Sequence, residues 1–314
     1  MPSTLTCSTL VLAGVALTAT APQDQPTFSA RSDLVVIHAM VEDRRGAPVA
    51  GLQKDHFLVY EDNYPQELQF FSTADAPATI GLLIDNSTSM STKRERVVAA
   101  AVQFAELSNP ADEVFVLAFN EDVREAWPAT VLDESSLSVL RATLLNQISA
   151  RGQTALYDAV AGGLVRLEKG RHTRQVLVVV SDGSDNASRR TRDAMLAAVR
   201  SSSAMVYSVA LQDRVDRDGN PRLLKQLASD TGGEFFNPDR SEEVSDALAH
   251  VARDIRATYT LGYVPRNQNR DGTMRKLRVV ARHPDGRTLK VQTRGGYMAP
   301  KPTSESGEVS SGRR

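Results

Sequence analysis

The feature that most constrains this chain is a regular alternation between residues 78 and 257, where continuous apolar runs are separated by segments of helical period. Residues 80–84 and 176–180 are two such runs, as expected for strands buried on both faces of a sheet. After the first run, Val97, Val98 and Ala101 repeat at the spacing of one helix face. Repeated strand–helix units predict an α/β fold with a mostly parallel sheet, right-handed crossovers and helices on both faces.

Shorter strand-like segments lie on both sides of this region. They are residues 34–37, 57–60 and 68–71 before it, and residues 259–263, 276–280 and 289–292 after it. Neither flank has enough strands to bury a sheet face alone. We therefore predict that the flanks pair as one small antiparallel β domain into which the α/β domain is inserted. The predicted segments are an N-terminal β segment at 27–75, the inserted domain at 76–257, a C-terminal β segment at 258–298 and a disordered tail at 299–314.

The first 26 residues contain no Lys or Arg, and an apolar stretch at residues 10–17 is followed by Ala19-Thr20-Ala21. An apolar segment before a small-x-small triplet predicts a secretory signal peptide at residues 1–21. The missing positive n-region departs from that pattern, and the alternatives are a misassigned start codon or a short uncleaved anchor. Export would place the protein in the periplasm, on the cell surface or in the medium. The single cysteine, Cys7, lies in the segment that is predicted to be removed, and no apolar run reaches the ~20 residues of a transmembrane helix.

The charge balance limits the classes of partner. The chain has 37 Lys and Arg against 38 Asp and Glu, so it lacks the basic excess that a general nucleic-acid binder needs to neutralise phosphates. Aromatic residues make up only 5% of the chain, which weakens any function based on stacking bases. We therefore expect no nucleic-acid partner.

Oxygen-bearing side chains follow the two most strand-like segments. Asp85, Ser87 and Ser89 come directly after the first, and Asp182 follows the second. In a doubly wound sheet, ligands bind at the carboxyl ends of strands where the strand order reverses, so these residues can face one another there. Two adjacent carboxylates repel unless a cation neutralises them, and oxygen-only ligands favour a hard divalent ion, Mg²⁺ above all. The alternative is that the carboxylates cap the following helices and the hydroxyls satisfy turn backbone.

A family resemblance rests on three motifs, which are Asp85-x-Ser87-x-Ser89, Gly152-x-Thr154 and Ser181-Asp182-Gly183. Together they resemble the metal-ion-dependent adhesion site of von Willebrand factor type A domains. The strand and helix series of residues 78–257 is similar to that family in order and length, which implies a doubly wound, Rossmann-like sheet of six strands. The flanks, which include Tyr259-x-Leu261-Gly262-Tyr263, resemble an exported acidobacterial subgroup of the family.

The resemblance implies a role for each matching residue. Ser87, Ser89 and Thr154 would be direct or near-direct ligands of Mg²⁺, with Mn²⁺ or Ca²⁺ as alternatives. Asp85 and Asp182 would bind the ion through water or directly. In this family the last metal position is filled by a carboxylate of a partner protein. The resemblance thus implies an exported, non-enzymatic adhesion or interaction module that binds an acidic side chain of a partner protein through the cation.

Two other functions stay open at this point. One is a structural or assembly protein of the cell envelope with a stabilising metal site, and the other is a Mg²⁺-dependent hydrolase. An aspartyl phosphatase needs a carboxylate where Ser87 stands, and a serine hydrolase needs Gly-x-Ser-x-Gly, which is missing around this residue. The five histidines show no paired spacing and are expected at the surface rather than as ligands: His38, His56, His172, His250 and His283.

Overall fold

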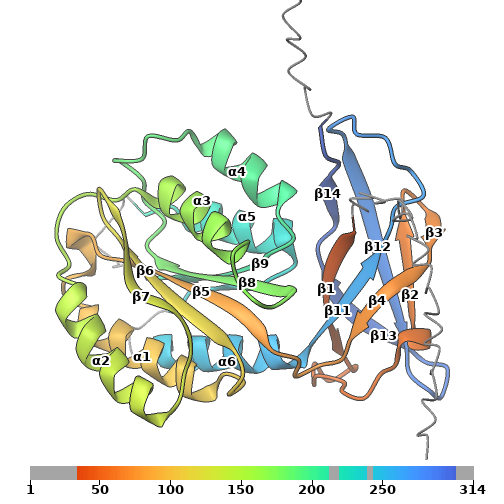
Figure 1. The fold of residues 1–314 in the computed structure, drawn as a ribbon, viewed down its shortest axis with the longest axis horizontal. Coiled ribbons are helices and arrows are strands. Elements are labelled where there is room, and N and C mark those ends of the chain that lie inside the picture. The colour runs from red at the N-terminus through yellow and green to blue at the C-terminus, as the bar shows by residue number, and fades with distance from the viewer. Residues whose placement is uncertain (1–33, 212–218, 239–242, 302–314) are drawn as a thin grey trace, which may run out of the picture. The chain divides into compact units, whose positions relative to one another are not determined.

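The computed structural model describes residues 34–211, 219–238 and 243–301, which belong to one compact unit. The predicted signal peptide, and the predicted tail beyond residue 301, lie outside the described residues. Within those residues, no helix is both long enough and apolar enough to cross a bilayer. The chain forms two sheets, one from the inserted region and one from the flanks (Figure 1).

The inserted region forms a six-stranded sheet in the order β10-β9-β8-β5-β6-β7. Its strands are β5 (Ala78–Asp85), β6 (Glu113–Phe119), β7 (Val123–Val131), β8 (Arg174–Ser181), β9 (Met205–Ala210) and β10 (Phe235–Phe236). All neighbours pair in parallel except β6 and β7, which are antiparallel. The predicted fold class, a doubly wound and mostly parallel sheet of six strands, is confirmed.

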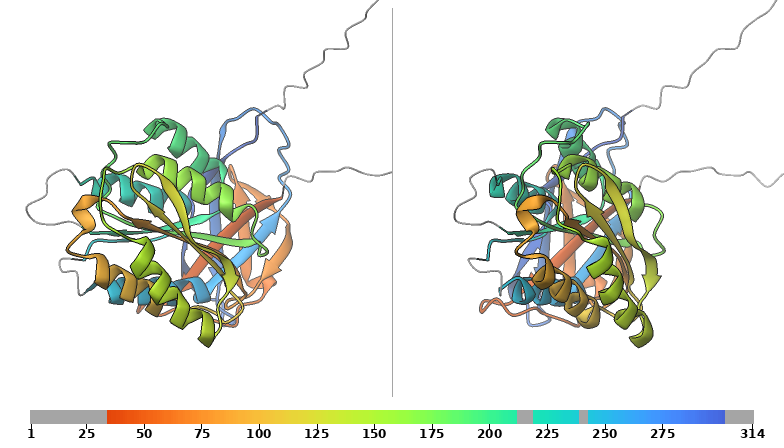
Figure 2. Two further views of the ribbon diagram at one scale, coloured as in Figure 1. Left: turned by 60° about the vertical axis from the view of Figure 1, so that its left-hand side comes forward. Right: turned by 90° about the vertical axis from the view of Figure 1, so that its left-hand side faces the viewer.

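Helices cover both faces of this sheet (Figures 1 and 2). One face carries α1 (Arg94–Leu107), α2 (Glu134–Gln147) and α6 (Val244–Ala257), and the other carries α3 (Leu156–Leu167), α4 (Arg192–Ser201) and α5 (Pro221–Thr231). Each set buries its apolar side chains against one face of the strands, and the two cores are separate. This double burial explains why β5 and β8 are apolar on both faces.

The strand β7 was not anticipated along the sequence, although the family fold implied a sixth strand. It is an edge strand, and its side chains are largely exposed. It contains Pro128, and its pairing with β6 shifts register twice. Proline is tolerated at a sheet edge because the outward N–H needs no ladder partner. An exposed edge strand therefore lacks the apolar signal that marks the inner strands.

The flanks form a second sheet of eight antiparallel strands in the order β3-β2-β12-β13-β1-β11-β4, with β14 paired to β12. The strands are β1 (Val35–Glu42), β2 (Phe57–Glu61), β3 (Tyr64–Gln66), β4 (Leu68–Ser72), β11 (Thr258–Tyr263), β12 (Met274–Arg282), β13 (Thr288–Thr293) and β14 (Gly296–Met298). N-terminal and C-terminal strands interleave, with β1 between β13 and β11 and with β2 against β12. The predicted pairing of the two flanks is confirmed.

Two buried arginines connect the sheets. Arg174, at the start of β8, donates to carbonyl groups on both chain crossings between the sheets. Arg294, after β13, donates to the carbonyl oxygens of Arg200 and Ser202 at the end of α4.

His38 of β1 lies close to this junction and is buried, so the prediction that the histidines lie at the surface is wrong for this residue. Burial lowers the pKa of His38 to about 3, which keeps its ring neutral.

Candidate metal centre

The candidate site lies where the strand order of the six-stranded sheet reverses. The strands β5 and β8 are parallel neighbours, with Ile84 opposite Val180, so Asp85 and Ser181 end their strands at the same edge. The helix α1 follows β5 onto one face, and α4 follows β8 onto the other. A crevice at the carboxyl ends of two such strands is the usual ligand position in this architecture.

The carboxylate of Asp85 is fully buried at the base of the site. The Ser87 N–H donates to Asp85 Oδ1 at 2.9 Å, and the Ser181 hydroxyl donates to Oδ2 at 2.7 Å. Burial raises the pKa of Asp85 to about 6, although these hydrogen bonds lower it, and the negative charge of Asp182 adds to the rise. In the absence of a cation, a charge at this position is therefore costly.

Three further oxygens form a chain above this carboxylate. The Ser87 and Ser89 hydroxyl oxygens lie 3.1 Å apart, and the Ser89 hydroxyl donates to Asp182 Oδ2 at 2.7 Å. The other carboxylate oxygen of Asp182 accepts hydrogen bonds from the Ser184 N–H and hydroxyl. Ser87 and Asp182 are buried and Ser89 is partly buried. The structure thus brings Asp85, Ser87, Ser89 and Asp182 into one hydrogen-bonded group.

Thr154 reaches the same edge on a separate loop. The Thr88 N–H and hydroxyl both donate to the Gly152 carbonyl, which joins this loop to the one after β5. Gly152 has φ +88°, a left-handed backbone conformation that side-chain-bearing residues rarely adopt, so this turn favours glycine. Thr154 itself is buried, and its N–H donates to Asn186 Oδ1 on the loop that carries Asp182. The loop of Thr154 is therefore tied to the loops that carry the other four residues, but, among the described residues, the Thr154 hydroxyl takes no part in the hydrogen bonds of their group.

Some residues that hold the site together received no role in the sequence analysis. Asn86 accepts a hydrogen bond from the Ala150 N–H through its side chain and from the Arg151 N–H through its carbonyl. Ser181 and Asn86 sit beside the motif acids, so their position in the sequence was a usable signal. The contact between Asn186 and Thr154 joins residues 32 positions apart, which no local pattern reveals.

The donor set can be compared with the chemistry of a hard cation. The side-chain atoms of this hydrogen-bonded group that could bind a metal are all carboxylate or hydroxyl oxygens. Mg²⁺ prefers such oxygens and retains several waters, whereas softer metals prefer nitrogen or sulfur ligands. The buried, unneutralised Asp85 is also what a neighbouring positive charge would stabilise. The residues therefore fit a hard divalent ion.

The variant Asp85→Asn tests the electrostatic cost of this site. Because the pKa of Asp85 is raised from 3.8 to about 6, the folded metal-free chain binds a proton more tightly than the unfolded chain. The stability that comes from the protonated carboxyl is present at low pH and is lost as the pH rises through about 6. In EDTA at about pH 7, we expect the free energy of unfolding of Asp85→Asn to be about 2 to 3 kcal/mol higher than that of the unsubstituted chain.

The measurement is urea unfolding of both chains in EDTA at about pH 4 and about pH 7. The difference in the free energy of unfolding should be small at the lower pH and grow towards the higher one. A constant difference across this range, or a less stable variant at neutral pH, would contradict the assigned electrostatics.

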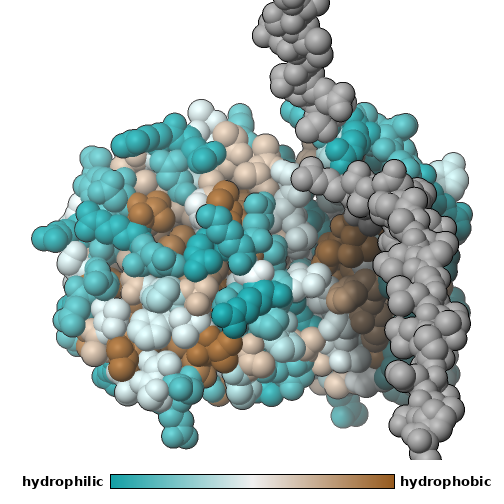
Figure 3. Space-filling view, viewed as in Figure 1, coloured by the Kyte–Doolittle hydropathy of each residue, from teal (hydrophilic) through white to brown (hydrophobic). Residues whose placement is uncertain are grey.

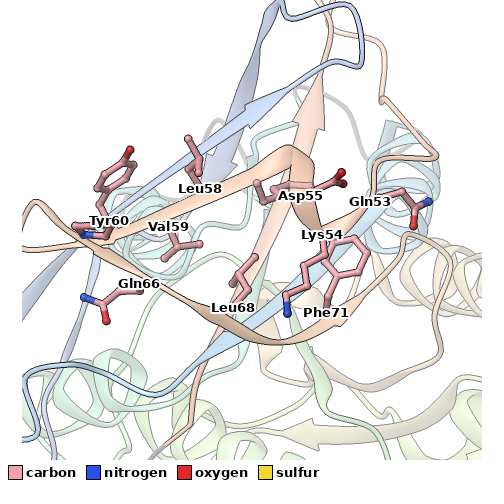
Figure 4. A pocket seen from close by; sticks show the side chains of 11 residues that line it. Gln53, Lys54, Asp55, Leu58, Val59, Tyr60, Gln66, Leu68 and Phe71 are labelled. Carbon is pink, nitrogen blue, oxygen red and sulfur yellow. The ribbon is translucent and has the colours of Figure 1, made fainter.

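A separate hollow lies on the eight-stranded sheet, away from these oxygens (Figure 4). It has a volume of about 430 Å³, and side chains from β2 and β4 form its apolar walls, including Val59, Leu68 and Phe71. Gln53, Lys54 and Asp55 lie along one end. The hollow shares no lining residue with the oxygen cluster, so the two are independent features.

Comparisons with known proteins agree with this description. A family model for the von Willebrand factor type A domain matches residues 79–250. A solved von Willebrand factor type A structure from Catenulispora acidiphila is 13% identical, covers 86% of this chain and 74% of its own, and has a TM-score of 0.51. A search of curated proteins gave no match.

Two further solved structures align mainly with part of the chain. The PilB minor pilin from Streptococcus sanguinis is 13% identical over 59% of this chain and 62% of its own, with a TM-score of 0.48. The vWF domain of the type V pili tip protein Mfa5 from Porphyromonas gingivalis is 11% identical. It covers 59% of this chain and 96% of its own, also with a TM-score of 0.48.

Proposed function

Because this chain belongs to the von Willebrand factor type A family, we propose that it is a non-enzymatic module that binds a partner protein through a divalent cation. The residues proposed to hold that cation are Asp85, Ser87, Ser89, Thr154 and Asp182. The observation that supports this most is the continuous hydrogen-bonded path from Asp85 through Ser87 and Ser89 to Asp182. It gathers hard oxygen donors from separate loops at the edge of the sheet where ligands bind in this architecture.

Each residue has a defined task in this proposal. Ser87, Ser89 and Thr154 would be neutral ligands, so they would add no negative charge around the cation. The buried Asp85 and Asp182 would supply the compensating negative charge. Ser181 fixes the orientation of the first carboxylate, and Ser184 fixes that of the second. Mg²⁺, or Mn²⁺ or Ca²⁺ in its place, would supply an exchangeable coordination position that a carboxylate of the partner can fill.

The surface of the six-stranded domain bears on how it could bind a partner. The visible face of the six-stranded domain is mainly hydrophilic, and its hydrophobic side chains form only small, separate patches (Figure 3). Broad apolar docking on that face therefore has little support. A charged anchor with polar surroundings would give specificity and a fast encounter rather than a large buried area.

Catalysis is the weaker alternative. Hydrolysis assisted by a cation needs a group that accepts a proton from water or from a nucleophile. Among the described residues, no histidine takes part in the hydrogen bonds of this cluster, and the two carboxylates are assigned to the cation. A structural or assembly role, in which the eight-stranded sheet makes the main contacts, is the second alternative and predicts binding that does not depend on metal.

Export and the finer family assignment belong to the same proposal. The predicted signal peptide at residues 1–21 would send the chain to the periplasm, the cell surface or the medium. There Mg²⁺ and Ca²⁺ would be available to the site, and a carboxylate on another exported protein could meet it. Membership of the exported acidobacterial subgroup stays a prediction from the flanking sequences.

Affinity capture tests the proposal. The chain without residues 1–21 is immobilised and exposed to envelope and secreted proteins of the organism that makes it, in Mg²⁺ and in EDTA. We expect a defined protein to be retained in Mg²⁺, released by EDTA and displaced by a peptide rich in Asp and Glu. Retention that is equal in Mg²⁺ and EDTA would contradict the metal bridge and favour the structural alternative. Turnover of a phosphoester or peptide substrate that is lost in Asp85→Ala would instead favour the hydrolase.

A further inference from the structure

A second group of potential metal ligands lies away from the oxygen cluster. Glu234, His250 and Asp254 each offer one ligand atom, and the three atoms lie within 4.8 Å of one another. His250 Nε2 is 3.7 Å from Glu234 Oε2 and 3.4 Å from Asp254 Oδ1. Glu234 directly precedes β10, whereas the other two residues are one turn apart on α6.

The local structure explains how these side chains meet. Residues at i and i+4 of a helix lie on the same face, so His250 and Asp254 are stacked on α6. The helix α6 packs on the same face of the sheet as α1 (Figure 1). The ring of His250 lies 5.3 Å from the ring of Phe236 in β10, and this contact positions it beside Glu234.

Asp254 is a buried carboxylate with one oxygen unpartnered in the described part of the chain, which is a second observation at this cluster. It is 4% exposed, and its Oδ2 has no hydrogen-bond partner among the described residues. Burial, the negative charges of Glu234 and Glu42, and a side-chain hydrogen bond with Glu234 raise the pKa of Asp254 to about 7. The cations that face this region do not fully offset those charges, since Lys290 pairs with Glu42 at 2.6 Å and Arg253 lowers the pKa of Asp254 only in part. A buried carboxylate oxygen without a partner is costly unless a cation or a proton meets it.

The two distances from His250 Nε2 agree with the spacing of ligands around a transition metal. Metal–ligand distances of about 2.0 to 2.2 Å in tetrahedral geometry put neighbouring ligand atoms about 3.3 to 3.6 Å apart. The two distances from His250 Nε2 are close to this range. An imidazole nitrogen with two carboxylate oxygens suits Zn²⁺ better than Mg²⁺ or Ca²⁺, which prefer oxygen alone.

We propose that Glu234, His250 and Asp254 form a second cation site, specific for Zn²⁺ or a similar transition metal and separate from the proposed Mg²⁺ site. Three protein ligands leave at least one position for water, and entry is open because the His250 side chain is 47% exposed. The bound ion links the residue before β10 to the C-terminal half of α6. A protonated His250 shared between two carboxylates is the competing arrangement, but a single N–H can point at only one of them.

Zn²⁺ binding by the untagged chain, measured by calorimetry and metal analysis in excess Mg²⁺, tests this site. We expect about one Zn²⁺ per chain and a rise in the unfolding temperature when Zn²⁺ is added. The variants His250→Ala and Asp254→Asn should each weaken Zn²⁺ binding at least about tenfold. Co²⁺ in place of Zn²⁺ should give the visible absorption of a low-coordinate site, and His250→Ala should abolish it.

Two matched variants separate this site from others. His283→Ala removes an exposed histidine that also faces a carboxylate, that of Asp285 at 3.0 Å, and should leave Zn²⁺ binding unchanged. Asp182→Asn disables the proposed Mg²⁺ site and should also leave it unchanged. Zn²⁺ binding that is absent, unaffected by His250→Ala, or lost in Asp182→Asn would overturn the second site. Because His250 is partly exposed, its variant keeps the test decisive if Asp254→Asn does not fold.

Discussion

Replacing Asp182 with asparagine is expected to lower the affinity of the chain for Mn²⁺ by about 10- to 100-fold and to abolish metal-dependent capture of the partner. Asp182 Oδ2 accepts a hydrogen bond from Ser89, and Oδ1 accepts two from Ser184. Asparagine keeps the size of the side chain but removes one negative charge from a buried position. The cation would then face Asp85 as the only carboxylate of the group.

The measurement is a Mn²⁺ titration in which the free ion is followed by electron paramagnetic resonance. Asp122→Asn is the matched control, because this acidic residue lies after β6 at the same edge of the sheet, but its side chain is 65% exposed and pairs with Arg124. It removes the same charge without touching the oxygen cluster. Equal Mn²⁺ affinities for the two variants would mean that Asp182 is not a ligand and that only the overall charge matters.

Substituting methionine for Arg174 is expected to reduce the free energy of unfolding by about 3 kcal/mol or more. Arg174 is 3% exposed, and its guanidinium donates to the carbonyl groups of Thr73, Ala76 and Ile255 and to the Thr260 hydroxyl. These acceptors come from both chain crossings between the sheets and from β11. Methionine fills part of the volume but leaves several acceptors without donors, and each unsatisfied buried group costs about 1 to 3 kcal/mol.

Urea unfolding of Arg174→Met checks this value, with Arg124→Met as the control. Arg124 is 69% exposed and pairs only with Asp122 among the contacts described, so its loss should change the free energy of unfolding by less than about 0.5 kcal/mol. Similar stabilities for the two variants would show that the junction does not depend on Arg174. Two separate unfolding transitions in Arg174→Met would show that the arginine couples the two sheets.

Much of the fold could be predicted because burial on two faces leaves a strong signal. The runs in β5 and β8 are apolar at nearly every position, and each helix between strands has an apolar stripe. The β7 strand escaped detection because it lies at an edge and carries Pro128 and exposed side chains. The pairing of the flanks could be inferred only because neither flank can bury a face alone, and the strand order within that sheet could not be read from local patterns.

The proposed Mg²⁺ site was accessible from the sequence for a different reason. Parallel strands end at one edge, so residues that follow β5 and β8 must meet there, whatever the distance between them in the chain. The supporting contact between Thr154 and Asn186 depends on how two loops fold, which spacing does not reveal. The group around His250 was missed because only its contact with Asp254 is local, whereas Glu234 arrives from another element.

Anomalous diffraction from Mn²⁺-soaked crystals would test the central claim most directly. The proposed function predicts an anomalous peak about 2.0 to 2.3 Å from Ser87 Oγ, Ser89 Oγ and Thr154 Oγ1, with the carboxylates of Asp85 and Asp182 in the same coordination sphere or one water away. An occupied Mn²⁺ position elsewhere in the crystal, with no peak among these five side chains, would contradict it.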